Sequence, residues 1–192
     1  MKIYSILTCR SRGACPGHRI FQKEHTHLWL SKIEEEIEHS LSHQNLSGYA
    51  IEVSTLKYDT SMPSLNRDEF IDFIKKIESM LPKKLPVVWV MHFNPKLCKE
   101  HELFLKNKKV KITADNTIQS RHNVAKWTKE ALIASKRSTI FDPSDYISID
   151  SKDFYKINKN QIDINHYPSG GHKQTMYIFE KLRQVFELAF KK

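Results

Sequence analysis

Short apolar runs alternate along the chain with longer segments in which apolar residues recur every three or four positions. The short runs are typical of strands buried on both faces of a sheet, and they comprise Ile3–Leu7, Tyr49–Val53, Val87–Met91 and Ser138–Phe141. The longer segments predict amphipathic helices over Leu28–Leu41, Asp68–Leu81, Val124–Ala134 and about Lys173–Phe190. Strands of this kind separated by helices favour a parallel sheet. We therefore predict an α/β three-layer sandwich, flavodoxin-like, with a parallel sheet of about four to five strands.

The size of the chain suits one domain over residues 1–192. It has 192 residues, of which 40% are hydrophobic, enough for a sizeable core. No apolar run has the length needed to cross a bilayer. The three cysteines are an odd number, so they do not form a complete set of disulfides. The first residues lack the pattern of a signal peptide. We therefore expect reduced thiols and a cytoplasmic protein.

The net charge of +9 raises nucleic acid as a partner. The lysines, however, are interspersed with acidic residues, and no zinc-finger or RNA-binding signature accompanies the densest basic run, residues 106–111. The charge pattern disfavours nucleic acid and fits an anionic small ligand. The sequence gives no indication of the oligomeric state.

The residues that follow the four apolar runs are the first candidates for a functional site, because parallel sheets bind ligands beyond the carboxyl ends of their strands. Cys9 follows the first run and Ser54 the second. His92 and Asn94 follow the third, and Asp142 the fourth. His92 could line the crevice or be a core histidine bonded to a carbonyl group.

Cys9 is the candidate nucleophile. Cys9 follows the end of a strand, where backbone N–H groups of the loop can stabilise an oxyanion that forms next to its sulfur. Arg10 and Arg12 would favour its thiolate and could hold an anionic group of the substrate. Ser11 is the reserve nucleophile. The alternative is that Cys9 is a small residue packed at a strand end.

The segment before the last predicted helix offers a partner for this thiol. Asp163 and His166 stand three residues apart in a turn-rich stretch, where a carboxylate can orient an imidazole. The alternative is that Asp163 caps local backbone groups. In the first case, Cys9, His166 and Asp163 form a nucleophile–base–acid triad.

These two motifs resemble the first and last blocks of the SGNH (GDSL-type) hydrolase superfamily. Asp163-x-x-His166, followed by Pro-Ser-Gly-Gly and a helix, is similar to its last block, and Thr8-Cys9 stands where its Asp-Ser lies. A cysteine at this position resembles GSCFA-type domains and capsule-biosynthesis acetyltransferase-like proteins. The resemblance implies an esterase or acyltransferase acting on an ester, a thioester or an acylated carbohydrate, with a role in polysaccharide biosynthesis. It implies no required cofactor, although a coenzyme A thioester could be the acyl donor.

The chain also departs from this superfamily. It has no G-x-N-D block, so the usual asparagine donor to the oxyanion is missing, and Ser54 or the N–H groups after Cys9 would have to serve. Gly13 could partly replace the glycine block. Each lost donor costs about 2.7–4 kcal/mol of transition-state stabilisation. The alternative function is therefore a non-catalytic module that binds a glycan or an anionic ligand.

A metal site is not predicted. Cys15, His18, His25 and His27 lie in one predicted loop, but they lack the spacing of paired zinc ligands.

Overall fold

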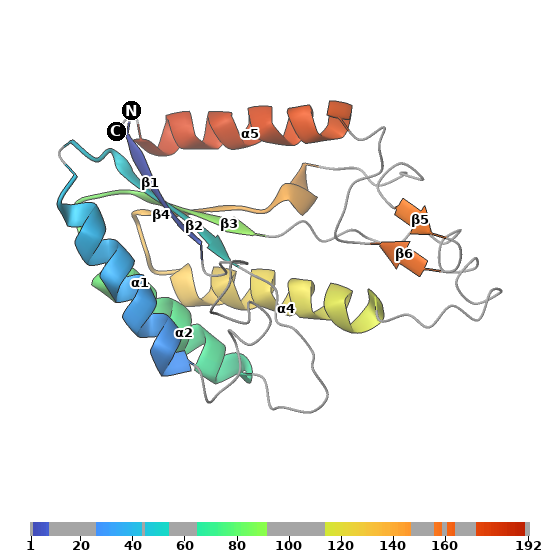
Figure 1. Ribbon diagram of the computed structural model, residues 1–192, viewed down its shortest axis with the longest axis horizontal. Coiled ribbons are helices and arrows are strands. Elements are labelled where there is room, and N and C mark those ends of the chain that lie inside the picture. Colours follow the sequence, from blue (N-terminus) through green and yellow to red (C-terminus); the bar gives the residue numbers. More distant parts are fainter. Residues whose placement is uncertain are drawn as a thin grey trace.

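The computed structural model describes residues 2–7, 26–43, 45–53, 65–91, 114–146, 156–158, 161–163 and 172–190 (Figure 1). Its main sheet consists of β1 (Ile3–Leu7), β2 (Gly48–Val53), β3 (Val87–Met91) and β4 (Ser138–Phe141). The helices are α1 (Thr26–Leu41), α2 (Arg67–Met80), α4 (Ala114–Leu132) and α5 (His172–Phe190). A short 3-10 helix, Pro143–Asp145, follows β4, and β5 (Lys156–Asn158) and β6 (Gln161–Asp163) form an antiparallel pair.

The four strands of the main sheet are parallel and lie in the order of the chain, β1-β2-β3-β4. Parallel crossovers are almost always right-handed, so an order that advances in one direction puts every crossover helix on the same face. Figure 1 shows α1, α2 and α4 on one face and α5 on the other. The predicted three-layer α/β sandwich is confirmed. The strand order differs from the 2-1-3-4-5 order of flavodoxin-like sheets and does not reverse among the described strands.

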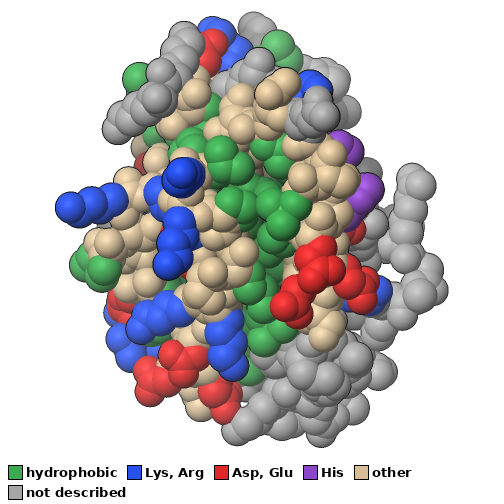
Figure 2. Space-filling view, turned by 90° about the vertical axis from the view of Figure 1, so that its left-hand side faces the viewer, with side chains coloured by type: hydrophobic (Ala, Val, Ile, Leu, Met, Phe, Trp, Pro, Cys, Tyr) green, Lys and Arg blue, Asp and Glu red, His purple; other side chains and the backbone are tan. Residues whose placement is uncertain are grey.

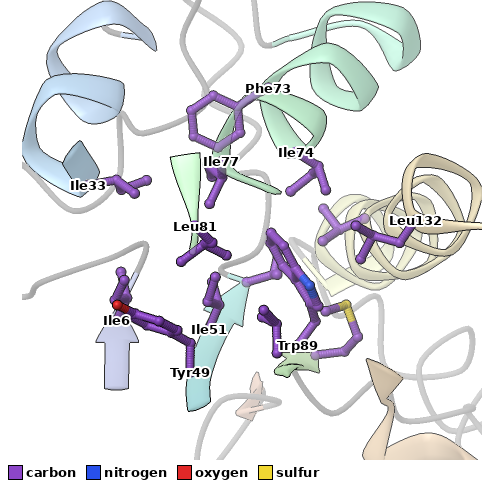
Figure 3. Packing of buried hydrophobic residues seen from close by; sticks show 14 of the residues in the cluster. Ile6, Ile33, Tyr49, Ile51, Phe73, Ile74, Ile77, Leu81, Trp89 and Leu132 are labelled. Carbon is purple, nitrogen blue, oxygen red and sulfur yellow. The ribbon is translucent and has the colours of Figure 1, made fainter. Parts of the chain in front are cut away.

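The core lies between the sheet and the three crossover helices. Alternate residues of the two central strands point into it, and Trp89 of β3 and Ile51 of β2 are fully buried there. Figure 3 shows Phe73 and Ile77 of α2 packed above them. The indole Nε1 of Trp89 donates a hydrogen bond to Ser138 Oγ at 3.1 Å, which satisfies its one polar group. Because both faces of these strands are covered, their sequences are largely apolar, with Glu52 near the end of β2 as the charged exception.

Helix α5 crosses the opposite face of the sheet. A side chain at Gly48 would overlap the ring of Phe190 and the carbonyl oxygen of Pro86, so glycine allows this close approach. The last residue of α5 therefore lies over the first residue of β2, at the edge where the strands begin. Figure 1 shows that α5 runs antiparallel to the strands and ends there. Its 19 residues span roughly 28 Å, whereas the six residues of β2 span roughly 20 Å. Helix α5 therefore begins toward the carboxyl ends of the strands.

Two elements differ from the sequence prediction. Helix α4 begins at Ala114, ten residues before the predicted start at Val124. The stretch before Val124 contains mostly polar residues, which gave no apolar periodicity to follow. Asp163 was expected in a turn, but it is the last residue of β6, where it pairs with Lys156.

No helix in the described ranges is both long enough and apolar enough to cross a membrane.

Candidate functional site

The carboxyl ends of the four strands lie side by side. Leu7 pairs with Glu52, Glu52 with Val90, and Val90 with Phe141, which makes one row across the whole sheet. Each strand ends in this row or one residue after it, so the chain leaves the sheet four times along the same edge. We call this the carboxyl edge and the opposite side the amino edge.

The sequence candidates follow these strand ends, but most of them lie outside the described residues. This holds for Cys9, Arg10, Ser11, Gly13, Ser54, His92, Asn94 and His166. Asp163 is described through its backbone, in β6. The triad therefore stays a prediction, as do the proposed oxyanion donors.

Asp142 is the candidate that the structure describes at the carboxyl edge. It directly follows β4, and its side chain is only 8% exposed. A buried carboxylate requires polar partners, and Lys129 Nζ of α4 lies 3.3 Å from Asp142 Oδ2 and 3.7 Å from Asp145 Oδ2. The Asp142 carbonyl group accepts the N–H of Asp145 at 3.0 Å, which starts the 3-10 helix. Asp142 thus fixes the path of the chain as it leaves the sheet.

Sequence reasoning identified Asp142 by its place after a strand but missed Lys129. The two residues are 13 positions apart, and Lys126, the other lysine of α4, would fit an ion pair equally well in the sequence. Only the packing of α4 beneath the sheet selects Lys129.

A second polar cluster lies at the amino edge, where α2 ends and β4 begins. Glu78 Oε1 accepts from Arg137 Nε at 2.9 Å and from Ser135 Oγ at 2.7 Å, and Oε2 accepts from Ser138 Oγ at 3.0 Å. Arg137 Nη1 also donates to the carbonyl groups of Leu81 and Pro82, at 3.2 and 2.5 Å. These carbonyl groups directly follow α2, and Arg137 Nη2 donates to the carbonyl group of Glu78 in its last turn, where the helix itself supplies no donor. Both carboxylate oxygens of Glu78 are engaged within the protein, so this cluster has a structural role.

A third group, of aromatic, acidic and histidine side chains, joins Tyr4 of β1 to the second half of α1 and the residues after it. Tyr4 Oη donates to Glu36 Oε2 at 3.0 Å. The ring of Tyr4 lies 5.6 Å from that of His43, and the rings of His39 and His43 are 5.2 Å apart. Across the described side chains, however, no three His, Cys, Asp or Glu residues are grouped so that they could hold a metal ion.

Comparison with known proteins adds no relative. No protein-family model matches the chain, and a search of curated proteins finds no match. The candidate site is therefore defined by the sheet and the sequence alone.

Proposed function

We propose that the chain is an esterase or acyltransferase that acts on an ester, a thioester or an acylated carbohydrate at the carboxyl edge. His166, which Asp163 orients, takes the proton of the Cys9 thiol, the thiolate attacks the carbonyl carbon, and the leaving alkoxide or thiolate receives that proton from His166. The resulting thioester on Cys9 is then attacked by water or a sugar hydroxyl group, whose proton passes to His166. A coenzyme A thioester is an admissible donor. Acylation of a carbohydrate by this route fits a cytoplasmic step of polysaccharide biosynthesis.

The observation that carries the proposal is the direction of α5. Phe190, at the end of α5, lies against Gly48 at the amino edge, so the helix starts toward the carboxyl edge. His166 precedes α5 by six residues. At the other end of the chain, Cys9 comes two residues after Leu7, so their Cα atoms are at most about 7.6 Å apart. Both ends of the chain therefore lead toward the same edge of the sheet, which a shared site requires.

The neighbouring strand ends support the binding part of the proposal. Val53 and Met91 pair across β2 and β3, and Ser54 and His92 directly follow them in the sequence. A hydroxyl group, an imidazole and the amide of Asn94 thus come from adjacent strands beside the one that leads to Cys9. In the proposed site, Ser54 and the N–H groups after Cys9, helped by the freedom of Gly13, donate to the oxyanion. His92, Asn94, Arg10 and Ser11 contact the substrate.

Thiol labelling tests the proposed triad. Iodoacetamide at neutral pH should alkylate Cys9 faster than Cys15 and Cys98, because a nearby imidazole favours the thiolate. The variant His166→Ala should slow the labelling of Cys9 alone. The matched control is His39→Ala, which removes an exposed histidine of α1 and should leave all three rates unchanged. Site-resolved mass spectrometry measures the rates.

Turnover separates an enzyme from a binding module. The wild type should release nitrophenol from p-nitrophenyl acetate and carry an acyl group on Cys9 in quenched samples. Cys9→Ala should remove both signals, whereas Ser11→Ala, which removes a substrate contact, should still carry the acyl group on Cys9. An acyl group found on Ser11 would assign the nucleophile to that residue instead. Equal labelling of the three cysteines, with no acyl adduct, would mean that the domain binds a ligand without transforming it.

A further inference from the structure

Two neighbouring helices end at the amino edge and leave apolar side chains there. Leu41 is the last residue of α1 and is 61% exposed. Met80 ends α2, and Leu46 and Leu85 lie in the connections that lead to β2 and β3; all three are half-buried against the core. We call these four residues the amino-edge strip. Figure 2 shows hydrophobic side chains forming a continuous band down this side of the molecule.

Charges of opposite sign border this strip. Glu34 and Glu38 are exposed residues seven and three positions before Leu41, which places them on its side of α1. Lys76 is exposed and four positions before Met80, and Lys83 is exposed in the turn after α2. Figure 2 shows acidic side chains to the right of the apolar band, and to its left basic side chains with a group of acidic ones below them. Beside the strip, the surface is thus apolar in the middle, with Glu34 and Glu38 on one flank and Lys76 and Lys83 on the other.

These border charges are not paired with any other described residue of the protomer. Among the residues that the structure describes, neither the two glutamates nor the two lysines form an ion pair or a side-chain hydrogen bond. Other exposed charges do pair, as Arg67 does with Glu130 at 2.8 Å. An exposed apolar band with unpaired, segregated charges on either side has the composition of a protein interface, with an apolar centre and a polar rim.

We propose that the amino-edge strip is the interface of a homodimer whose two-fold axis runs along the band. Rotation about this axis puts the acidic flank of each protomer opposite the basic flank of its partner. An axis across the band would instead oppose like charges. The same patch on both subunits then serves as an isologous interface, in which the leucines and Met80 supply desolvated area and the charges fix the orientation. The carboxyl edge of each protomer stays open, and the proposal does not depend on the chemistry proposed for it.

The apolar part of the proposal is tested by the oligomeric state of the full chain. Sedimentation equilibrium should show a wild-type dimer at tens of micromolar. Leu41→Glu should raise the dissociation constant at least tenfold. The matched control is Met176→Glu, which alters a side chain of similar exposure, 67%, on α5, and it should leave the constant unchanged. A wild type that remains monomeric up to 0.5 mM would overturn the proposal. The strip would then be free to bind a different protein.

Charge exchange tests the direction of the axis. The pair Lys76→Glu and Lys83→Glu makes both flanks acidic, and the pair Glu34→Lys and Glu38→Lys makes both flanks basic. Each double variant should be monomeric and folded by circular dichroism. Mixed one to one, they should form a heterodimer, because acid then faces base on both flanks. Homodimers that survive in either double variant, or a mixture that stays monomeric while the wild type dimerises, would contradict the proposed arrangement.

Discussion

The two edges of the sheet differ in how the described side chains are used. At the amino edge, Glu78 and Arg137 satisfy each other and the end of α2, with both side chains less than a fifth exposed. At the carboxyl edge, the described ion pair joins a buried Asp142 to Lys129, which is 46% exposed. The chain also leaves β1, β2 and β3 there toward the residues proposed to do chemistry. At one end of the four strands, Glu78 and Arg137 are thus bonded to each other, whereas the other end leads to the residues proposed to bind a ligand, as expected where ligands bind at carboxyl ends.

The largest expected effect is at the amino edge. Arg137→Ala removes the charged partner of Glu78 and the donor to the carbonyl groups of Leu81 and Pro82 just after α2, so we expect a loss of about 2–3 kcal/mol in the free energy of unfolding. Urea denaturation measures this change. The rate of Cys9 alkylation should stay the same in the folded variant, because Arg137 lies at the other end of the strands. A loss below about 1 kcal/mol would show that the network does not hold this edge.

A smaller effect is expected where α2 begins, toward the carboxyl edge. Asn66 Oδ1 accepts the N–H of Glu69 at 3.0 Å, and Glu69 Oε2 accepts the N–H of Asn66 at 3.0 Å. Asn66→Ala removes half of this capping box and should cost about 1 kcal/mol. Ser79→Ala, at the other end of the same helix, is the control, since its exposed hydroxyl group donates only to a local carbonyl group. The two variants should differ in urea midpoint, and equal midpoints would contradict the role of the cap.

The ion pair at the carboxyl edge should contribute less. Lys129→Ala should lower the free energy of unfolding by about 0.5–1 kcal/mol, because the lysine is half exposed and solvent weakens its attraction to Asp142. A double-mutant cycle with Asp142→Asn measures the coupling between the two side chains. The coupling should decrease with added salt. A coupling as large as the loss from Arg137→Ala would remove the contrast between the two edges.

The smallest effect is expected in an Arg–Glu network on the exposed surface of α5. Arg183 donates to Glu180 Oε1 at 2.6 Å and to Oε2 at 3.0 Å, and these hydrogen bonds, with the charge of Arg183, lower the pKa of Glu180 below its ordinary value of 4.5. A depressed carboxyl pKa contributes stability above the ordinary value and loses it as the pH falls through the lowered pKa. Glu180→Gln should therefore be slightly less stable than the wild type at pH 7. The difference should vanish as the pH falls well below 4.5, and a difference that persists in acid would contradict this cause.

The strands of the main sheet were predictable because local sequence determines them, whereas β5 and β6 were not predicted. Ile3–Leu7, Val87–Met91 and Ser138–Phe141 were predicted with the bounds that the structure has. In each case a run rich in β-branched and other apolar residues is bounded by polar residues or proline. The start of α4 was not predictable in this way, because residues 114–123 carry little apolar periodicity and form a helix in the context of the whole fold.

The partners of the polar side chains were not predictable, since they depend on contacts between distant segments. Glu78 and Arg137 are 59 positions apart, and nothing in the sequence distinguishes this pair from others. For the candidate site, the sequence predicted only the edge of the sheet at which it lies. The rule for parallel sheets selected the residues after each strand, and Asp142 was found there, whereas Lys129 required knowledge of how α4 packs.

The sequence by itself determined the alternation of strands and helices, and with it the parallel sheet, because apolar spacing decides which faces of a segment must be buried. Only the tertiary structure decided the strand order, the placement of α5 on its own face and the pairing of charges at the two edges. These features depend on crossover handedness and on close contacts such as that of Phe190 with Gly48, which join residues far apart in the chain.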